Sequence, residues 1–223
     1  MRRTIRQDEL FDFTDKTVKV YLKKLVKEYS ALVRQINALP FDEVNALVIS
    51  SAVSKTYDDL EKEAFIIFCL IYARVYKFCL KEHYTDGMEQ ALVTALLEGY
   101  NGVTKYVYTS ECDRKRARLY EAIMGATEVG RTSAAVRSLV KKEVETAQRL
   151  FARQIEQYAD NVTCAALLQA YTDAGVKRFK WVAVNDEKTC GTCKKYDGKV
   201  YNVDDLPPYP AHYYCRCILI PMI

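Results

Sequence analysis

Four cysteines and a histidine lie close together near the end of this 223-residue chain. They are Cys190, Cys193, His212, Cys215 and Cys217, all within 28 positions. Thiolate and imidazole are ligands that zinc prefers, and two such pairs with two-residue gaps, separated by roughly 15–20 residues, are typical of zinc sites. A two-residue gap allows a tight turn to direct two side chains to one point. The spacing therefore predicts a structural zinc ion.

Five candidate ligands compete for the four positions of a tetrahedral site. We expect Cys190, Cys193 and His212 to bind the ion together with either Cys215 or Cys217. Residues two apart in an extended strand point to the same face, so either thiolate could complete the site, and the choice stays open. A structural metal would contribute folding free energy on the order of 10 kcal/mol, which a C-terminal unit with few apolar residues needs.

Other roles for these cysteines stay open. The Cys190-x-x-Cys193 spacing also occurs in thiol-disulfide oxidoreductases, where it begins a helix, but residues 194–199 read as a turn. Disulfides would replace the metal if the protein works outside the cytosol. Catalytic zinc is disfavoured because neither the His-Glu-x-x-His motif nor the deaminase pattern is present. The remaining cysteines are expected to be small buried hydrophobes of predicted helices: Cys69, Cys79, Cys112 and Cys164.

Composition and charge set limits on the class of protein. Half of the residues are apolar, which is enough for a sizeable core, and the net charge of +4 is too mild to demand nucleic acid as a partner. No secretory signal is visible at the basic N-terminus. The longest apolar stretch, residues 64–80, contains Arg74 and Lys77 and is shorter than the roughly 20 residues of a membrane span. We expect a buried helix there, and a cytoplasmic setting with reduced thiols.

Apolar residues recur at helical spacing through residues 1–110, which we interpret as an N-terminal helical region. The expected elements are a helix from an N-cap at Thr14 to before Pro40, a short helix capped by Asp42, a helix over 58–83, a turn over 85–87, a helix ending near Gly99, and a connector or short strand over 100–110.

Residues 111–175 form a predicted central region with a helix over 112–124 and a long helix over 132–172. Asp160-Asn161 is a candidate interruption of the long helix, and Gly175 its end. In residues 176–223 the pattern changes to period two, with strands expected over 176–184, 199–203 and 215–220. The predicted fold is therefore mainly α, and α+β overall: a helical body with a small C-terminal β module stapled by zinc.

The C-terminal residues also resemble the signature of the phage head morphogenesis, or minor head, proteins, a family similar to the Mu F protein. About 45 residues carry the resemblance. The matching positions, in order, are Trp181, Asp186, Thr189, Cys190, Cys193, Asp197, Gly198, Pro207, Pro208, His212, Cys215, Arg216, Cys217 and Pro221.

This resemblance implies a non-enzymatic virion component, associated with the portal vertex, that assists capsid assembly, DNA packaging or genome delivery. Portal and capsid proteins would be its partners, and DNA is a further candidate. No small-molecule substrate is expected. The protein would be found in the capsid interior or at the portal vertex, and in the host cytoplasm during assembly. Some relatives carry a toxin or ADP-ribosyltransferase domain after the signature, and we expect none here because the chain stops six residues after Cys217.

Two other functions remain as alternatives: a zinc-ribbon-like nucleic-acid-binding module and a thiol-disulfide oxidoreductase. The first is weakened by the acidic residues that dilute the lysines of residues 176–223. Residues 1–40 and the basic stretch 114–118 are candidate partner or DNA contacts, although a solvated helix face explains both equally simply. Arg216 is a candidate ion-pair partner of Asp186. The 17 tyrosines suit either the edge of a core or an interface.

Overall fold

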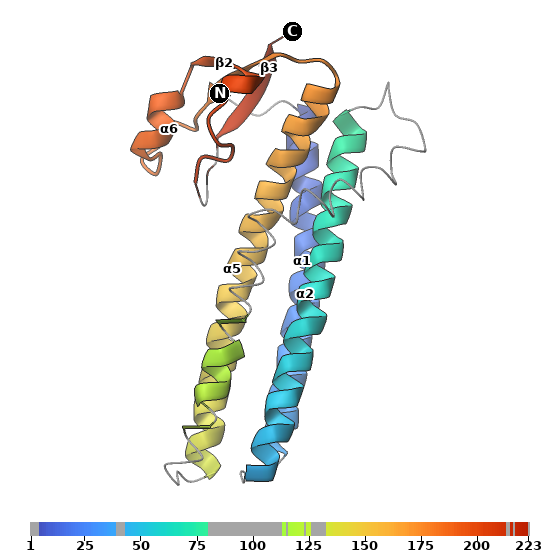
Figure 1. Ribbon diagram of the computed structural model, residues 1–223, viewed down its shortest axis with the longest axis vertical. Coiled ribbons are helices and arrows are strands. Elements are labelled where there is room, and N and C mark those ends of the chain that lie inside the picture. The colour runs from blue at the N-terminus through green and yellow to red at the C-terminus, as the bar shows by residue number, and fades with distance from the viewer. Residues whose placement is uncertain are drawn as a thin grey trace. The chain divides into compact units, whose positions relative to one another are not determined.

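The computed structural model describes residues 5–38, 43–79, 113–114, 116–122, 124–125, 133–212, 215 and 217–222. The long helices are α1 (Ile5–Asn37), α2 (Glu43–Cys79) and α5 (Ser133–Asp173), and residues 113–114, 116–122 and 124–125 contribute further helical turns (Figure 1). The remaining elements lie near the C-terminus: β1 (Arg178–Val182), α6 (Gly191–Tyr196), β2 (Val200–Asn202), the 3-10 turn η1 (Val203–Asp205) and β3 (Ile218–Met222). The predicted mainly α fold with a small C-terminal β module is confirmed.

The chain divides into two compact units. The first unit contains Met1–Thr17, Phe68–Ala95 and Glu156–Ile223, and the second contains Val18–Ile67 and Leu96–Ile155. Each of the three long helices therefore contributes residues to both units. The sequence-based division after residues 110 and 175 remains a prediction.

A single helix, α2, replaces the two helices expected between residues 42 and 83. The apolar residues continue at helical spacing between the two expected helices. Ile49, Val53, Tyr57 and Leu60 are all buried, so one continuous face meets the core.

No helix in the described part of the chain has the length and apolar character needed to cross a membrane. The turn, helix and connector expected within residues 84–110 lie outside the described residues.

Helix α1 begins at Ile5, so the prediction of an N-cap at Thr14 is wrong. Thr14 is buried inside the helix, where its hydroxyl donates to the Leu10 carbonyl at 3.1 Å, the usual way for a threonine to satisfy itself in a helix interior. Its Oγ1 atom also lies 2.9 Å from Oγ1 of Thr163, which is equally buried on α5. Threonine often caps helices, but Thr14 instead forms a polar contact between two helices of the first unit.

The second unit has an aromatic core made by α1, α2 and α5. The rings of Tyr29 and Tyr57 meet edge to face at 5.9 Å between centroids, and Tyr57 meets Phe151 in the same way at 5.7 Å. The Tyr21 hydroxyl donates to the Leu60 carbonyl at 2.7 Å, which links α1 to α2. These tyrosines are fully buried. They act as core residues that carry one polar group each.

Helix α5 runs without interruption through Asp160-Asn161, so the predicted break there is wrong. It ends as expected at Gly175, whose φ of 85° suits a residue without a side chain. The Gly175 N–H donates to the Thr172 carbonyl at 2.9 Å and the Val176 N–H to the Tyr171 carbonyl at 3.0 Å. This Schellman motif turns the chain directly into β1, and it places the C-terminal module at the end of α5 (Figure 1).

Candidate metal centre

Strand β1 is the centre of the C-terminal module. It pairs antiparallel with β2 on one side and with β3 on the other, giving the sheet order β2-β1-β3. Phe179 and Trp181 lie two residues apart on β1, so they share one face, and both are fully buried. The small core around them includes Cys193, Cys215 and Cys217. The cysteines are therefore part of the module's interior.

The turn between β1 and α6 is held by two acidic side chains. Asp197 accepts hydrogen bonds from the Ala183 N–H at 2.8 Å and from the Asn185 side chain at 2.6 Å. Asn185 has a φ of 57°, a conformation that asparagine tolerates better than most residues. The Asn185 hydrogen bond is the largest reason why the pKa of Asp197 lies below its ordinary value. Asp197 thus ties the end of α6 to the end of β1.

A second turn immediately precedes the first cysteine. The carboxylate of Asp186 accepts hydrogen bonds from the Lys188 N–H at 3.0 Å and the Thr189 hydroxyl at 3.1 Å. The Asp186 N–H in turn donates to the Thr189 hydroxyl oxygen at 3.0 Å. This reciprocal arrangement fixes the chain direction just before Cys190.

Cys190 is the N-cap of the short helix α6, and its sulfur accepts a hydrogen bond from the Cys193 N–H at 3.3 Å. Residues 194–199 were expected to form a turn, and that expectation is wrong because α6 extends from Gly191 to Tyr196. The helix brings the side chains of Cys190 and Cys193 to the same end of its first turn. A redox role was disfavoured because a turn, and not a helix, was expected after Cys190-x-x-Cys193. Because α6 follows this motif, that argument no longer holds.

Tyr209 anchors the approach to the second ligand group. Its ring packs edge to face on Trp181 at 5.4 Å between centroids, and its hydroxyl donates to the Cys217 carbonyl at 3.1 Å. Burial of this side chain raises its pKa well above the ordinary value. The Cys215 N–H then donates to the His212 carbonyl at 3.2 Å, which closes a turn between these two residues. The third strand begins at Ile218, so the expected strand over 215–220 is displaced toward the C-terminus.

The structure brings all five predicted donor residues together. Nε2 of His212 lies 3.1 Å from Sγ of Cys190 and 3.0 Å from Sγ of Cys193. Sγ of Cys193 lies 3.8 Å from Sγ of Cys215. The donor atoms form two groups, Cys190–Cys193–His212 and Cys193–Cys215–Cys217, each with all atoms within 4.8 Å of one another. Cys193 belongs to both groups, and the cluster could hold a metal ion.

The four thiols of the cluster differ in pKa, mainly because of hydrogen bonds and burial. The backbone N–H of Cys193 is the main cause that lowers the pKa of Cys190 to about 7. A hydrogen bond from Cys217 lowers the pKa of Cys215 to about 5, and the same bond is the main cause that raises the pKa of Cys217 well above its ordinary value. Burial raises the pKa of Cys193 to about 12. The cluster therefore favours thiolate, the form that binds metals, at two of its positions.

Three observations test whether a metal fits here. Two sulfurs bound to one tetrahedral zinc lie roughly 3.8 Å apart when each Zn–S bond is about 2.3 Å, and the 3.8 Å between Cys193 and Cys215 shows that thiols approach one another this closely in the cluster. A cavity of about 20 Å³ is lined by Cys190, Cys193, His212 and Cys217. The buried Nε1–H of Trp181 has no hydrogen-bond acceptor among the described residues, and it lies close enough to Cys217 to lower the pKa of that thiol in part. The donor set and its surroundings fit a thiophilic cation.

Other sequence-based expectations can be placed relative to this cluster. Cys69, Cys79 and Cys164 lie on the long helices and outside both donor groups, and all seven described cysteines are free thiols. Cys112 and the predicted ion pair of Arg216 lie outside the described residues. Tyr209 is a residue of the site that the sequence motif does not include. The sequence feature that could have indicated its role is its position between two prolines in an aromatic-rich segment.

Replacing Asp197 by Ala should destabilise the module by about 1–3 kcal/mol at pH 7, because the buried Ala183 N–H loses a charged acceptor. The folded-state pKa of Asp197 is lowered, so its contribution is complete above the unfolded pKa and disappears as the pH falls through the folded value. Fluorescence of Trp181, the only tryptophan, follows unfolding of this module between pH 7 and 3. Asp204→Ala serves as the exposed-carboxylate control, and an equal loss in that variant would contradict the role of Asp197.

Comparison with known proteins agrees with this arrangement. Residues 116–220 match the model of the family described as Phage Mu protein F like protein. The matched segment includes α5, Trp181 and every donor of the cluster. Searches among curated proteins and among solved structures gave no match. Over residues 116–220, the chain is therefore similar to the Phage Mu protein F like family.

Proposed function

We propose that the protein is a minor structural component of a phage head, whose C-terminal module is held together by one zinc ion. The family match over residues 116–220 carries this proposal, because the matched segment contains the complete donor cluster. Members of the family are structural head proteins, so a role in head morphogenesis follows for this chain. Association with the portal vertex and assistance in DNA packaging or genome delivery rest on the resemblance of the C-terminal signature.

The proposed ligands are Cys190, Cys193, His212 and Cys217. The first three form one donor group, and Cys217 lines the same small cavity whereas Cys215 does not. The indole N–H of Trp181 would serve as the outer partner that a ligating thiolate commonly has. Zinc suits a set of three sulfurs and one imidazole nitrogen. With four protein ligands no position stays open for a substrate, so the ion would be structural.

The ion would add to the stability that the small apolar core of the module provides. The cluster joins the segment 190–193 to the segment 212–217, which lie on opposite sides of β2 in the sequence. Within the module, the fully buried large side chains are Phe179 and Trp181. One ion that ties these two segments would contribute more than another pair of buried aliphatic residues.

Full-length protein purified under reducing conditions should contain about one zinc ion per chain by elemental analysis. Cys190→Ser and Cys193→Ser should lose the ion and shift the Trp181 unfolding transition to lower temperature, because each removes one of four ligands. Cys69→Ser is the matched control, since this thiol lies on α2 outside the cluster, and it should keep both the metal and the transition. Metal-free protein with an unchanged module would refute the site.

The same assay identifies the fourth ligand. Cys217→Ser should lose zinc, whereas Cys215→Ser should keep it, because only Cys217 lines the cavity with the other three donors. The opposite pattern would assign the fourth position to Cys215. Loss in neither variant would contradict a four-ligand site that includes either residue.

The location in the particle requires a separate experiment. Mass spectrometry of purified virions and of empty procapsids should detect the protein at a small fraction of the copies of the major capsid protein. Co-expression with the portal protein of the same phage should yield a complex that survives size-exclusion chromatography. Absence from both particles would contradict the structural role, and presence without a portal complex would remove only the portal association.

A thiol-disulfide oxidoreductase is the second candidate, because Cys190 begins a helix and has a pKa lowered to about 7. Reduction of insulin disulfides by the zinc-free protein, abolished in Cys193→Ser, would support it. We expect no such reduction, because His212 and Cys215 surround Cys193 and favour metal binding.

A further inference from the structure

Helix α1, the blue helix in Figure 1, carries a row of cations on its outward side within the second unit. Lys19, Lys23, Lys27 and Arg34 are all exposed, and they follow one another at intervals of four or seven residues. These intervals correspond to one and two helical turns, so the four side chains lie along one side of the helix. We call these four residues the basic row.

Acidic residues are absent from the side of α1 that carries the basic row. Between Lys19 and Asn37 the sequence contains one acidic residue, Glu28. Glu28 follows Lys24 by four residues and so shares its side of the helix, which faces α2 because Lys24 pairs with Glu63 there. Within the described part of the chain, no carboxylate forms an ion pair with a residue of the basic row.

The stability of the fold does not account for this arrangement. Like charges four residues apart repel one another on a helix, and Lys19, Lys23 and Lys27 form two such pairs. Arg34 suits the C-terminal end of the helix dipole, but the three lysines lie in the middle of α1, where the dipole has little effect. A partner of opposite charge would convert the repulsion into binding energy.

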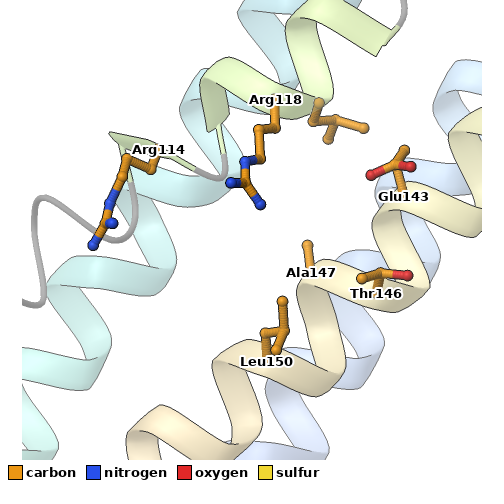
Figure 2. A pocket seen from close by; sticks show the side chains of 7 residues that line it. Arg114, Arg118, Glu143, Thr146, Ala147 and Leu150 are labelled. Carbon is orange, nitrogen blue, oxygen red and sulfur yellow. The ribbon is translucent and has the colours of Figure 1, made fainter.

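Other cations of the second unit have acidic neighbours. Lys141 lies 3.9 Å from Glu145 on α5. Arg118 lines a pocket of about 120 Å³ that Glu143 also lines from α5, as Figure 2 shows. The surface of α1 differs from these mixed surfaces. Residues 18–37 contain five Lys and Arg against one acidic residue, an excess as large as the net charge of +4 on the whole chain.

The composition of this surface favours DNA over an acidic protein. Protein interfaces depend on aromatic and apolar anchors and are depleted in lysine, whereas three of the four cations here are lysines. Val20 and Val26 are the exposed apolar side chains beside the basic row. They are small and lie six positions apart, on different sides of the row, so they do not form one apolar patch.

A lipid surface is disfavoured by what the other side of α1 contacts. An amphipathic helix binds a membrane by burying its apolar face at the lipid interface. In α1 that face already belongs to the core of the second unit, where Leu25, Tyr29 and Ile36 are fully buried. Only the charged side of the helix is available to a partner.

We propose that the basic row of α1 binds the phosphate backbone of double-stranded DNA without reading its sequence. A duplex carries one negative charge about every 1.7 Å along its axis, so it meets each cation without a shaped pocket. The row is about 22 Å long, which exceeds the major-groove width of about 12 Å and allows contact with phosphates of both strands. Helix α1 lies outside residues 116–220, so the inference rests neither on the family match nor on the metal.

Fluorescence anisotropy of the full-length protein with a labelled duplex of mixed sequence tests this binding. Raising the salt from about 50 to about 200 mM should weaken it about a hundredfold, because four phosphate contacts release counterions. Lys23→Ala combined with Lys27→Ala should weaken binding about tenfold or more at the lower salt, and should reduce the salt dependence by about two contacts. Both positions are exposed and alanine favours helix, so circular dichroism should show unchanged helix content.

Lys141→Ala combined with Lys142→Ala is the matched control, because it removes the same net charge from exposed positions of α5. Its affinity for DNA should stay within about twofold of the original. Absence of binding at the lower salt, or equal weakening in the two double variants, would overturn the proposal. A polyglutamate peptide that binds more tightly than DNA, and is lost in the Lys23 and Lys27 variant, would overturn it in favour of an acidic protein. The head-protein role is read from zinc content and from particles, so it is tested separately.

Discussion

The C-terminal module depends on the convergence of two distant segments on the sulfur of Cys193. This atom is the only one common to both donor groups of the described residues, and it has His212 at 3.0 Å on one side and Cys215 at 3.8 Å on the other. Without a cation, crowded and partly ionised sulfurs in a buried position would repel one another. A bound ion would convert that repulsion into attraction, so the same crowding would become a strong cross-link in the module.

The residues that match the family signature position these donors. Trp181 fills the core beneath them, and Asp186 with Thr189 sets the turn before Cys190. Asp197 binds the opposite end of α6 to the strand, and Gly198, with a φ of 75°, passes the chain back so that its N–H donates to the Trp181 carbonyl at 2.8 Å. Asp186, Asp197 and Gly198 fix the backbone on either side of the first two donors, and Trp181 packs beneath the cluster. This pattern favours structural metal binding over chemistry on a substrate.

Sequence patterns predicted the module better than the helices. Spacing alone placed five donors in one cluster, because local turns and two-residue gaps leave few alternatives. Helix boundaries were harder to predict, because serine and threonine can satisfy their hydroxyls inside a helix, as Thr14 does with the Leu10 carbonyl. The continuous α2 and α5 follow from burial of one long apolar face, which outweighs the local preference of Asp160-Asn161 for a turn. Contacts such as Tyr209 on Trp181 depend on tertiary packing and were not visible in the pattern.

A metal staple also suits the setting in which a phage head protein would have to fold. In the host cytoplasm thiols stay reduced, so disulfides between these cysteines would not form before assembly. The described cysteines are free thiols in the structure, with Cys193 and Cys215 sulfurs 3.8 Å apart, well beyond the roughly 2.05 Å of a disulfide bond. Zinc binding needs thiolates rather than an oxidant, and the backbone hydrogen bond from Cys193 already lowers the pKa of the proposed ligand Cys190 to about 7. With zinc bound, the module would therefore become rigid as the chain folds, before it meets a partner.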